Sequence, residues 1–234
     1  MSDSAAISGG LPGGAGVVPI RRDPHHVGHH AAGEGETRAP GRGIGGPAPK
    51  RIVVAYGFWI FLLSDIVMFS AFFAAFAVLR GGTAGGPTGA ELFDITNVAI
   101  ETVLLLVSSF ACGVATLALN ARRPLVFQAA MAVTFLFGAG FLALELREFA
   151  DLIARDAGPS RSAFLSAFFT VVGCHGLHVT AGLLWLLTMM AQVFAKGFRP
   201  DILRRVMCFS LFWHALDIVW VAVFTVVYLM GSAA

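Results

Sequence analysis

Five ionisable side chains interrupt long apolar runs of the sequence and are the first candidates for chemistry. His175 and His178 stand three residues apart, His214 and Asp217 have the same spacing, and Asp65 lies in the first apolar run. Residues three apart share one face of a helix, so each pair presents two groups that can bind or pass a proton to one neighbour. An ionisable group inside hydrocarbon costs about 3 kcal/mol or more, which predicts a polar partner or a function for each of the five.

The elements that must position these groups are membrane-spanning helices. Hydrophobic residues make up 57% and charged residues 13% of the 234 residues, and the mean hydropathy is +0.78. This composition is typical of a polytopic membrane protein. Five apolar runs approach or exceed the roughly 20 residues that cross a hydrocarbon layer as a helix. We therefore expect an all-α bundle of five transmembrane helices in a membrane domain of residues 51–234, with spans at 56–79, 98–119, 125–144, 167–194 and 206–230.

Residues 1–50 differ in composition from the rest of the chain: they are rich in Gly, Pro and Ala, with scattered charges and no periodic apolar pattern. Such a segment has nothing to bury, which predicts a disordered tail. It lacks the apolar stretch and cleavage site of a secretory signal, so we expect the first span to serve as an uncleaved targeting signal. The tail contains four clustered histidines, which we interpret as a solvated patch rather than a metal site because no Cys or paired carboxylates accompany them: His25, His26, His29 and His30.

The distribution of Lys and Arg predicts the orientation of the bundle, because basic residues in short flanking segments favour the cytoplasmic side. The side of the N-terminus carries Arg38, Arg42, Lys50, Arg51, Arg122, Arg123, Lys196, Arg199, Arg204 and Arg205, and the other side carries Arg80, Arg147, Arg155 and Arg161. We therefore expect a cytoplasmic N-terminus and, after five spans, a C-terminus on the opposite side. The net charge of +2 gives no reason to expect a nucleic-acid partner.

Depth and spacing suggest which polar groups meet. At about 1.5 Å per residue, Asp65 lies about 21 Å from Arg51 along the helix and so near the bilayer midplane. His175, His178, His214 and Asp217 fall at similar depth. If the last two helices pack through these faces, we expect Asp217 to accept a hydrogen bond from His178 and Asp65 to meet His175. Three further carboxyl groups are expected nearer the outer side, with the second and third at the outer end of the third helix: Glu101, Glu145 and Glu148.

Four interpretations of these groups stay open. Polar contacts between helices, worth about 0.6 to 2 kcal/mol each, fix packing without any chemistry and are favoured for the three histidines. A proton path needs polar groups that reach both faces. Haem ligation needs two histidines on opposite sides of the iron, which leaves His178 with His214. Lipid head-group contacts are the fourth. For Asp65 a structural role and a functional role are equally favoured.

The three cysteines form no paired motif and are interpreted as small apolar residues: Cys112, Cys174 and Cys208.

The chain from residue 56 to 232 resembles subunit III of the haem–copper respiratory oxidases, and most closely the five-helix form in cytochrome bo ubiquinol oxidases. The resemblance rests on seven segments that occur in order: GFWI at 57–60, LSD at 63–65, GTAGGPTG at 82–89, FGAGF at 137–141, FLSAFF at 164–169, HGLHV at 175–179, and FWH at 212–214 with DIVW at 217–220. Subunits III of cytochrome c oxidases usually have two additional helices before this region, and their absence favours the quinol branch.

The resemblance implies a non-catalytic subunit without a catalytic, cofactor-binding or metal site of its own. Such a chain packs beside the catalytic subunit I, with subunits II and IV, in a complex of the bacterial inner membrane. That complex oxidises ubiquinol, reduces oxygen to water with haem and copper, and pumps protons. In the family, the position of Asp65 holds a buried carboxylate, usually Glu, and the subunit holds phospholipid and supports assembly, sustained turnover and proton uptake.

Two other classes of protein remain as alternatives. A proton-coupled transporter would use Asp65 with His175 and His178, and would be expected to show inverted repeats or broken helices. The sequence contains no such repeat that we can detect. A stand-alone haem protein would show haem absorbance as a purified single chain.

Overall fold

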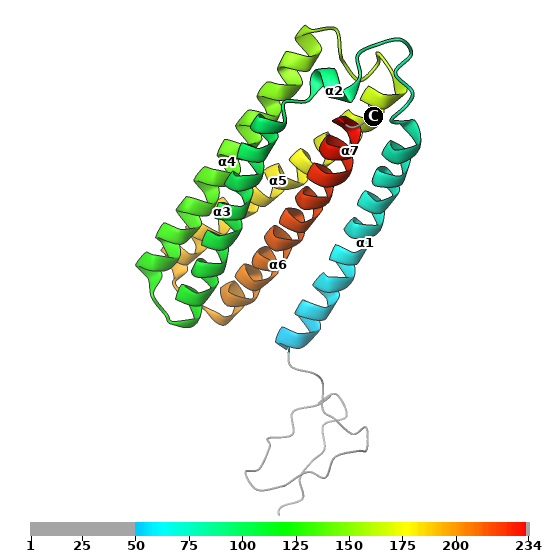
Figure 1. The fold of residues 1–234 in the computed structure, drawn as a ribbon. Coiled ribbons are helices and arrows are strands. Elements are labelled where there is room, and N and C mark those ends of the chain that lie inside the picture. The colour runs from blue at the N-terminus through cyan, green and yellow to red at the C-terminus, as the bar shows by residue number, and fades with distance from the viewer. Residues whose placement is uncertain (1–49, 233–234) are drawn as a thin grey trace, which may run out of the picture. The chain divides into compact units, whose positions relative to one another are not determined.

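The structure is a computed structural model that describes residues 50–232, and in this range it is helical without a strand. Five long helical paths alternate in direction (Figure 1). They are α1 (Lys50–Leu79), α3 (Ile95–Asn120), α4 (Pro124–Ala154), α5 (Ala163–Lys196) and a last path made of α6 (Pro200–Val223), the π-helix η1 (Phe224–Leu229) and α7 (Met230–Ser232). The short α2 (Gly89–Leu92) lies in the connection between α1 and α3. All five paths are long and apolar enough to cross a membrane, which confirms the predicted five-helix class. The tail predicted at residues 1–50 falls outside the described residues, apart from Lys50 at the start of α1.

Local sequence signals set the helix ends. The Asp94 side chain caps α3 by accepting from the backbone N–H of Thr96 at 3.0 Å, and Ser162 caps α5 by accepting from Leu165 at 3.2 Å. Pro124 and Pro200 begin α4 and α6, where a missing N–H has no cost. The connections between α3 and α4 and between α5 and α6 are therefore short, and the helices they join are antiparallel neighbours.

The third predicted span, 125–144, ends too early. Helix α4 continues to Ala154, so Glu145 and Glu148 lie inside the helix rather than at its end. Charged residues appeared to mark the membrane edge, but Glu145 is only 1% exposed because neighbouring helices cover it. This burial has consequences for the site described below.

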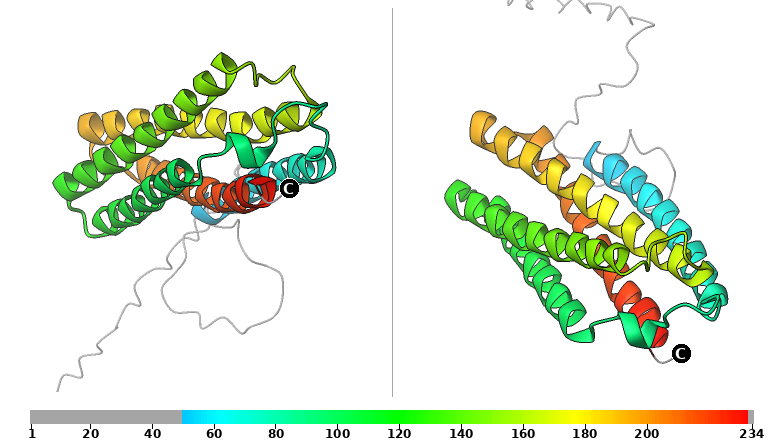
Figure 2. Two further views of the ribbon diagram at one scale, coloured as in Figure 1. Left: turned by 45° about the horizontal axis from the view of Figure 1, so that its top comes forward. Right: turned by 90° about the horizontal axis from the view of Figure 1, so that it is seen from above.

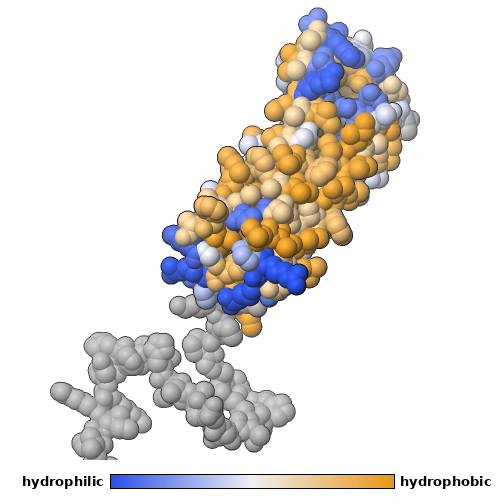
Figure 3. Space-filling model, turned by 90° about the vertical axis from the view of Figure 1, so that its left-hand side faces the viewer, coloured by the Kyte–Doolittle hydropathy of each residue, from blue (hydrophilic) through white to orange (hydrophobic). Residues whose placement is uncertain are grey.

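The helices differ in how much of their surface the bundle covers. In the views of Figure 2, α3 and α4 form one hairpin, α5 and α6 pack against it, and α1 lies at the margin. Helix α1 contacts α5 and α6, yet most of its large apolar side chains stay exposed. A space-filling view shows a broad apolar belt between hydrophilic ends (Figure 3), as expected for a protein surface in contact with lipid or with other membrane subunits.

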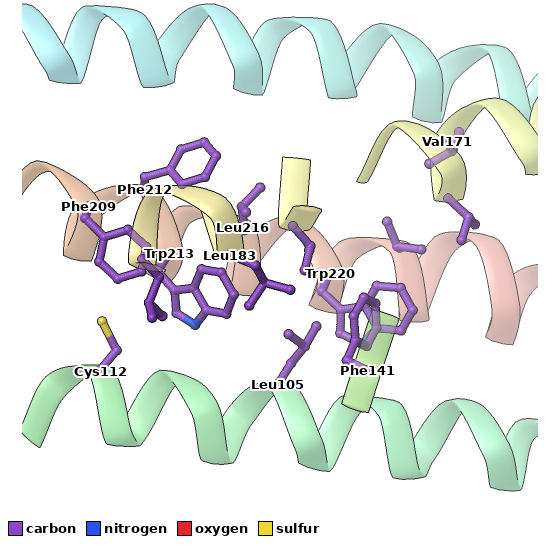
Figure 4. Close-up of a cluster of buried hydrophobic side chains, with 14 of the residues drawn as sticks. Leu105, Cys112, Phe141, Val171, Leu183, Phe209, Phe212, Trp213, Leu216 and Trp220 are labelled. Atoms are coloured by element: carbon purple, nitrogen blue, oxygen red, sulfur yellow. The ribbon is translucent and has the colours of Figure 1, made fainter. Parts of the chain in front are cut away.

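The core is built around two tryptophans of α6. Trp213 and Trp220 lie among Leu105 of α3, Phe141 of α4 and Leu183 of α5 (Figure 4). The ring of Trp220 is perpendicular to that of Phe141, with centroids 4.6 Å apart, a favourable edge-to-face geometry. Helices α3, α4 and α5 thus converge on α6.

Two glycines make room for Trp213. A Cβ at Gly138 of α4 or at Gly182 of α5 would approach the indole ring to 2.9 Å, closer than side chains can come without movement. These two glycines therefore allow the helices to approach closely. Gly57 and Gly113 have no such role within this chain, because a Cβ there would meet nothing within 4 Å.

Candidate functional site

A line of hydrogen bonds joins α3 to α6 through the middle of the bundle. The Trp220 indole N–H donates to the Thr102 hydroxyl at 3.0 Å, and that of Trp213 donates to the Ser108 hydroxyl at 3.1 Å. At the next residue of each helix, the Ser109 hydroxyl and Nδ1 of His214 are 2.7 Å apart. We refer to these three contacts as the α3–α6 hydrogen bonds. They give both indole N–H groups and His214 a partner inside an apolar bundle, whereas Oδ1 of Asp217 is buried without one. Such contacts are typical of structural packing between membrane helices.

The other two histidines bond to main-chain carbonyls. His175 is fully buried, and its Nε2–H donates to the carbonyl of Leu216 in α6 at 3.3 Å. His178 donates from Nδ1 to the carbonyl of Cys174, one turn earlier in the same helix, at 2.8 Å. The ring of His175 lies between aromatic neighbours, with centroids 5.6 Å from Phe141 and 5.1 Å from Trp220. Helix α5 is thus bound to α6 by a histidine.

The pairings expected between histidines and aspartates are wrong. Asp217 lies on the same face of α6 as His214, beside Ser109 of α3, rather than against His178. Asp65 is half-buried on α1 and faces Cys174, while His175 is bonded to α6. The rotation of α6 explains the difference, because its polar face turns toward α3 and not toward α5. His178 and His214 therefore face different helices and do not share a haem-sized site.

A cluster of three carboxyl groups lies elsewhere, between α3 and α4. Glu101 of α3 and Glu145 of α4 are 0% and 1% exposed, and both oxygens of Glu101 and Oε2 of Glu145 have no hydrogen-bond partner. Glu148, one turn along α4, accepts a hydrogen bond from the Tyr228 hydroxyl at 2.9 Å. The three groups, which we call the carboxyl cluster, interact electrostatically with one another. Within residues 50–232 none of them forms an ion pair.

The π-helix η1 carries the tyrosine of this cluster. A wide helical turn is uncommon and often occurs at functional sites. Here it lies at the point where Tyr228, fully buried, turns toward Glu148 and packs its ring 5.0 Å from that of Phe93. The sequence contained one signal for the cluster, because Glu145 and Glu148 have the same spacing of three as the histidine pairs.

Two hollows reach the carboxyl cluster. At the outer end of the bundle a cavity of about 220 Å³ is lined by polar side chains, among them Asp94, Arg147 and Glu148. Between α4 and α5 an open groove of about 500 Å³ has mostly apolar walls and contains Glu145. Among the described residues no three His, Cys, Asp or Glu side chains are arranged to hold a metal ion.

Comparison with known proteins identifies the family. The model of the family described as cytochrome c oxidase subunit III matches residues 48–232, which include the whole helical bundle. The chain belongs to the cytochrome c oxidase subunit III family. Subunit III is the non-catalytic subunit of haem–copper oxidases and carries no metal centre of its own, so membership assigns the chain to a multi-subunit oxidase complex.

Individual subunits III are similar over the same region. The chain is 54% identical over 177 residues to the cytochrome bo(3) ubiquinol oxidase subunit 3 of Pseudomonas aeruginosa, which covers 76% of this chain and 85% of the relative. It is 44% identical over 175 residues to the quinol oxidase subunit 3 of Bacillus subtilis, 75% of this chain and 86% of the relative. For the cytochrome c oxidase subunit 3 of Bacillus sp. strain PS3 the identity is 42% over 175 residues, 75% of this chain and 84% of the relative. The resemblance seen in the sequence motifs is confirmed.

Proposed function

We propose that this chain is the non-catalytic subunit III of a terminal ubiquinol oxidase of the cytochrome bo type. The observation that carries the proposal is the 54% identity to a subunit of that name over 177 residues. In such a complex, ubiquinol is oxidised, oxygen is reduced to water and protons are pumped by the neighbouring catalytic subunit. This chain supports the assembly, stability, lipid binding and sustained turnover of that neighbour.

The geometry of the bundle supports an accessory role. The polar groups of α5 and α6 are largely engaged by neighbouring helices, and the apolar belt offers a wide surface to partner subunits and lipid. We infer that the partners are the catalytic subunit I with subunits II and IV, and that haem and copper reside in subunit I. The complex lies in the bacterial inner membrane, with the N-terminus of this chain in the cytoplasm and its C-terminus in the periplasm.

The transporter alternative is not favoured. The relatives reported above are named as oxidase subunits. Among the hydrogen bonds of residues 50–232, none joins the proposed transport residues Asp65, His175 and His178 to one another, because His175 bonds to the carbonyl of Leu216 and His178 to that of Cys174. In addition, helices α1, α3, α4 and α5 are continuous, whereas transporter sites are typically formed by broken helices.

A mild-detergent pull-down tests the proposal. The full chain, tagged at its N-terminus, is purified from its native membrane, and an optical spectrum and quinol-driven oxygen consumption are recorded on the product. We expect a haem-containing quinol oxidase to co-purify, with the haem remaining on the other subunits when this chain is stripped away. A colourless chain recovered alone under conditions that keep other respiratory complexes intact would contradict the proposal.

A further inference from the structure

The groove between α4 and α5 has one polar feature that the accessory role leaves without a purpose. Its lining comes from these two helices alone, over residues 142–149 of α4 and 169–180 of α5. A volume of about 500 Å³ falls within the range of sites that hold a small molecule, about 300 to 1,000 Å³. On α5 the lining runs from residue 169 to 180, a length of about 16 Å.

Glu145 supplies the carboxyl group in the lining of the groove. Its side chain is 1% exposed, and its Oε2 has no hydrogen-bond partner. The two threonines of the groove are already satisfied, because Thr170 donates to the carbonyl of Ser166 at 2.7 Å and Thr180 to that of Gly176 at 2.8 Å. An occupant must therefore bring one hydrogen-bond donor and otherwise apolar surface.

Gly176 leaves the space that the carboxyl group of Glu145 occupies. A Cβ at this position would lie 2.5 Å from Oε1 of Glu145, so only glycine lets the carboxyl group reach the wall of the groove. Without a ligand the arrangement is unfavourable, because a buried acceptor without a partner has lost its hydrogen bonds to water.

Charge and shape select the kind of occupant. The lining of the groove contains the carboxyl group of Glu145 and no Lys or Arg side chain, so a phosphate-bearing head group would find no basic partner there. A neutral hydroxyl group needs no such partner. The rings of Phe149 and Phe169, with centroids 4.7 Å apart, form an aromatic wall, and Leu142, Leu146 and Leu177 provide an apolar one.

We propose that this groove binds one quinol molecule, with a ring hydroxyl donating to the carboxyl group of Glu145, the ring against Phe149 and Phe169, and the isoprenoid tail along the leucines. The inference rests on the proposed function, which places the chain in a membrane complex that is supplied with quinol. It concerns binding only, and no electron transfer is assigned to this chain.

Photolabelling of the intact complex in native membranes tests the site. The probe is a short-tailed ubiquinol that carries a diazirine on its tail, and the labelled peptides are identified by mass spectrometry. We expect label within 142–149 and 169–180, displaced by excess ubiquinol but not by excess phospholipid. Glu145→Leu should reduce this label about tenfold, the effect of losing one buried hydrogen bond.

A second variant fills the groove without removing the carboxyl group. A Cβ at Gly173 would meet only the Phe149 ring, at 3.5 and 3.9 Å, so Gly173→Leu should fold and block the label. Gly113→Leu is the matched control, because a Cβ there meets nothing within 4 Å and Gly113 does not line the groove. Glu91→Leu, at an exposed carboxyl group of α2, controls for the loss of a Glu. Neither control should change the label.

Three outcomes overturn the proposal: no label in these segments, label displaced by phospholipid but not by ubiquinol, or a cross-link from the groove to a helix of another subunit. Failure of the proposed function is recognised separately, by the haem spectrum and oxygen consumption of the pull-down. An active oxidase whose subunit III is unlabelled means that the function stands and the site does not. A labelled chain with which no oxidase co-purifies means that the site stands and the proposed function does not.

Discussion

At the residue scale, Trp213 shows how one side chain connects four helices. Its indole ring from α6 lies against Gly138 of α4 and Gly182 of α5, and its N–H donates to Ser108 of α3. Packing of this density leaves no space for an added methyl group, because protein interiors are as closely packed as organic crystals. The tryptophan therefore fixes the spacing of the helices around it.

Substitution of these glycines should measure that constraint. We expect Gly138→Ala to lower the stability of the protein by about 1 to 3 kcal/mol, since its Cβ would approach two atoms of the Trp213 ring to 2.9 Å. Gly140→Ala is the matched control two residues further along α4, where the Cβ would meet only Leu104, at 3.8 Å. Thermal denaturation in mild detergent compares the two. Equal midpoints for both variants would show that Trp213 can move.

Asp65 is the residue for which a structural and a functional role differ most clearly. It is half-buried on α1, the least covered helix, so its side chain contributes little to packing within this chain. We expect Asp65→Asn to leave the complex assembled and to shorten the period over which it sustains turnover. The measurement is the decay of quinol-driven oxygen consumption by the purified complex, with assembly followed by co-purification. If the complex fails to assemble, Asp65 is a structural contact instead.

At the scale of elements, the contact between α3 and α6 depends on hydrogen bonds as well as on packing. Lipid tails are as apolar as leucine, so apolar burial does little to draw helices together inside a membrane. The α3–α6 hydrogen bonds determine which faces of the two helices meet, because each joins a hydroxyl of α3 to a ring nitrogen of α6. They set the rotation of α6 that turns His214 and Asp217 away from α5.

A double-mutant cycle should detect this contribution. We expect Ser108→Ala and Trp213→Phe to couple by about 0.6 to 1.7 kcal/mol, the range for hydrogen bonds between membrane helices. The matched cycle pairs Trp213→Phe with Ser64→Ala, whose hydroxyl bonds only to the carbonyl of Phe61 in α1. The free energy of unfolding in detergent is measured for each variant. A coupling near zero in the first cycle would assign the contact to packing alone.

At the scale of the whole molecule, the basic residues at the two hydrophilic ends predict how the bundle is oriented in the membrane. The connection between α3 and α4 lies at one end of the bundle, and the connection between α4 and α5 lies at the other (Figure 1). The first contains Arg122 and Arg123, and it belongs to the side with more basic residues. From the positive-inside tendency we therefore propose that this connection lies in the cytoplasm.

Cysteine labelling should verify this orientation. In a background in which Cys112, Cys174 and Cys208 are replaced by Ala, we expect Ser160→Cys to react with an impermeant maleimide in intact spheroplasts. Ala121→Cys should react only after the membrane is opened. Both positions are exposed in connections between helices, so they differ in side of the membrane and not in access. The reversed pattern would invert the proposed topology.

The number of spans and the family follow from local properties of the sequence, namely the length of the apolar runs and contiguous motifs. Which polar groups meet depends instead on tertiary contacts. Spacing placed His214 and Asp217 on one face of α6, but the rotation of that helix depends on contacts between residues about 100 positions apart, such as Ser109 with His214. The burial of Glu145 could not be predicted from the sequence either. Along the chain Glu145 marked a membrane edge, whereas in the folded protein α5 covers it at Gly176 and it lines a groove between α4 and α5.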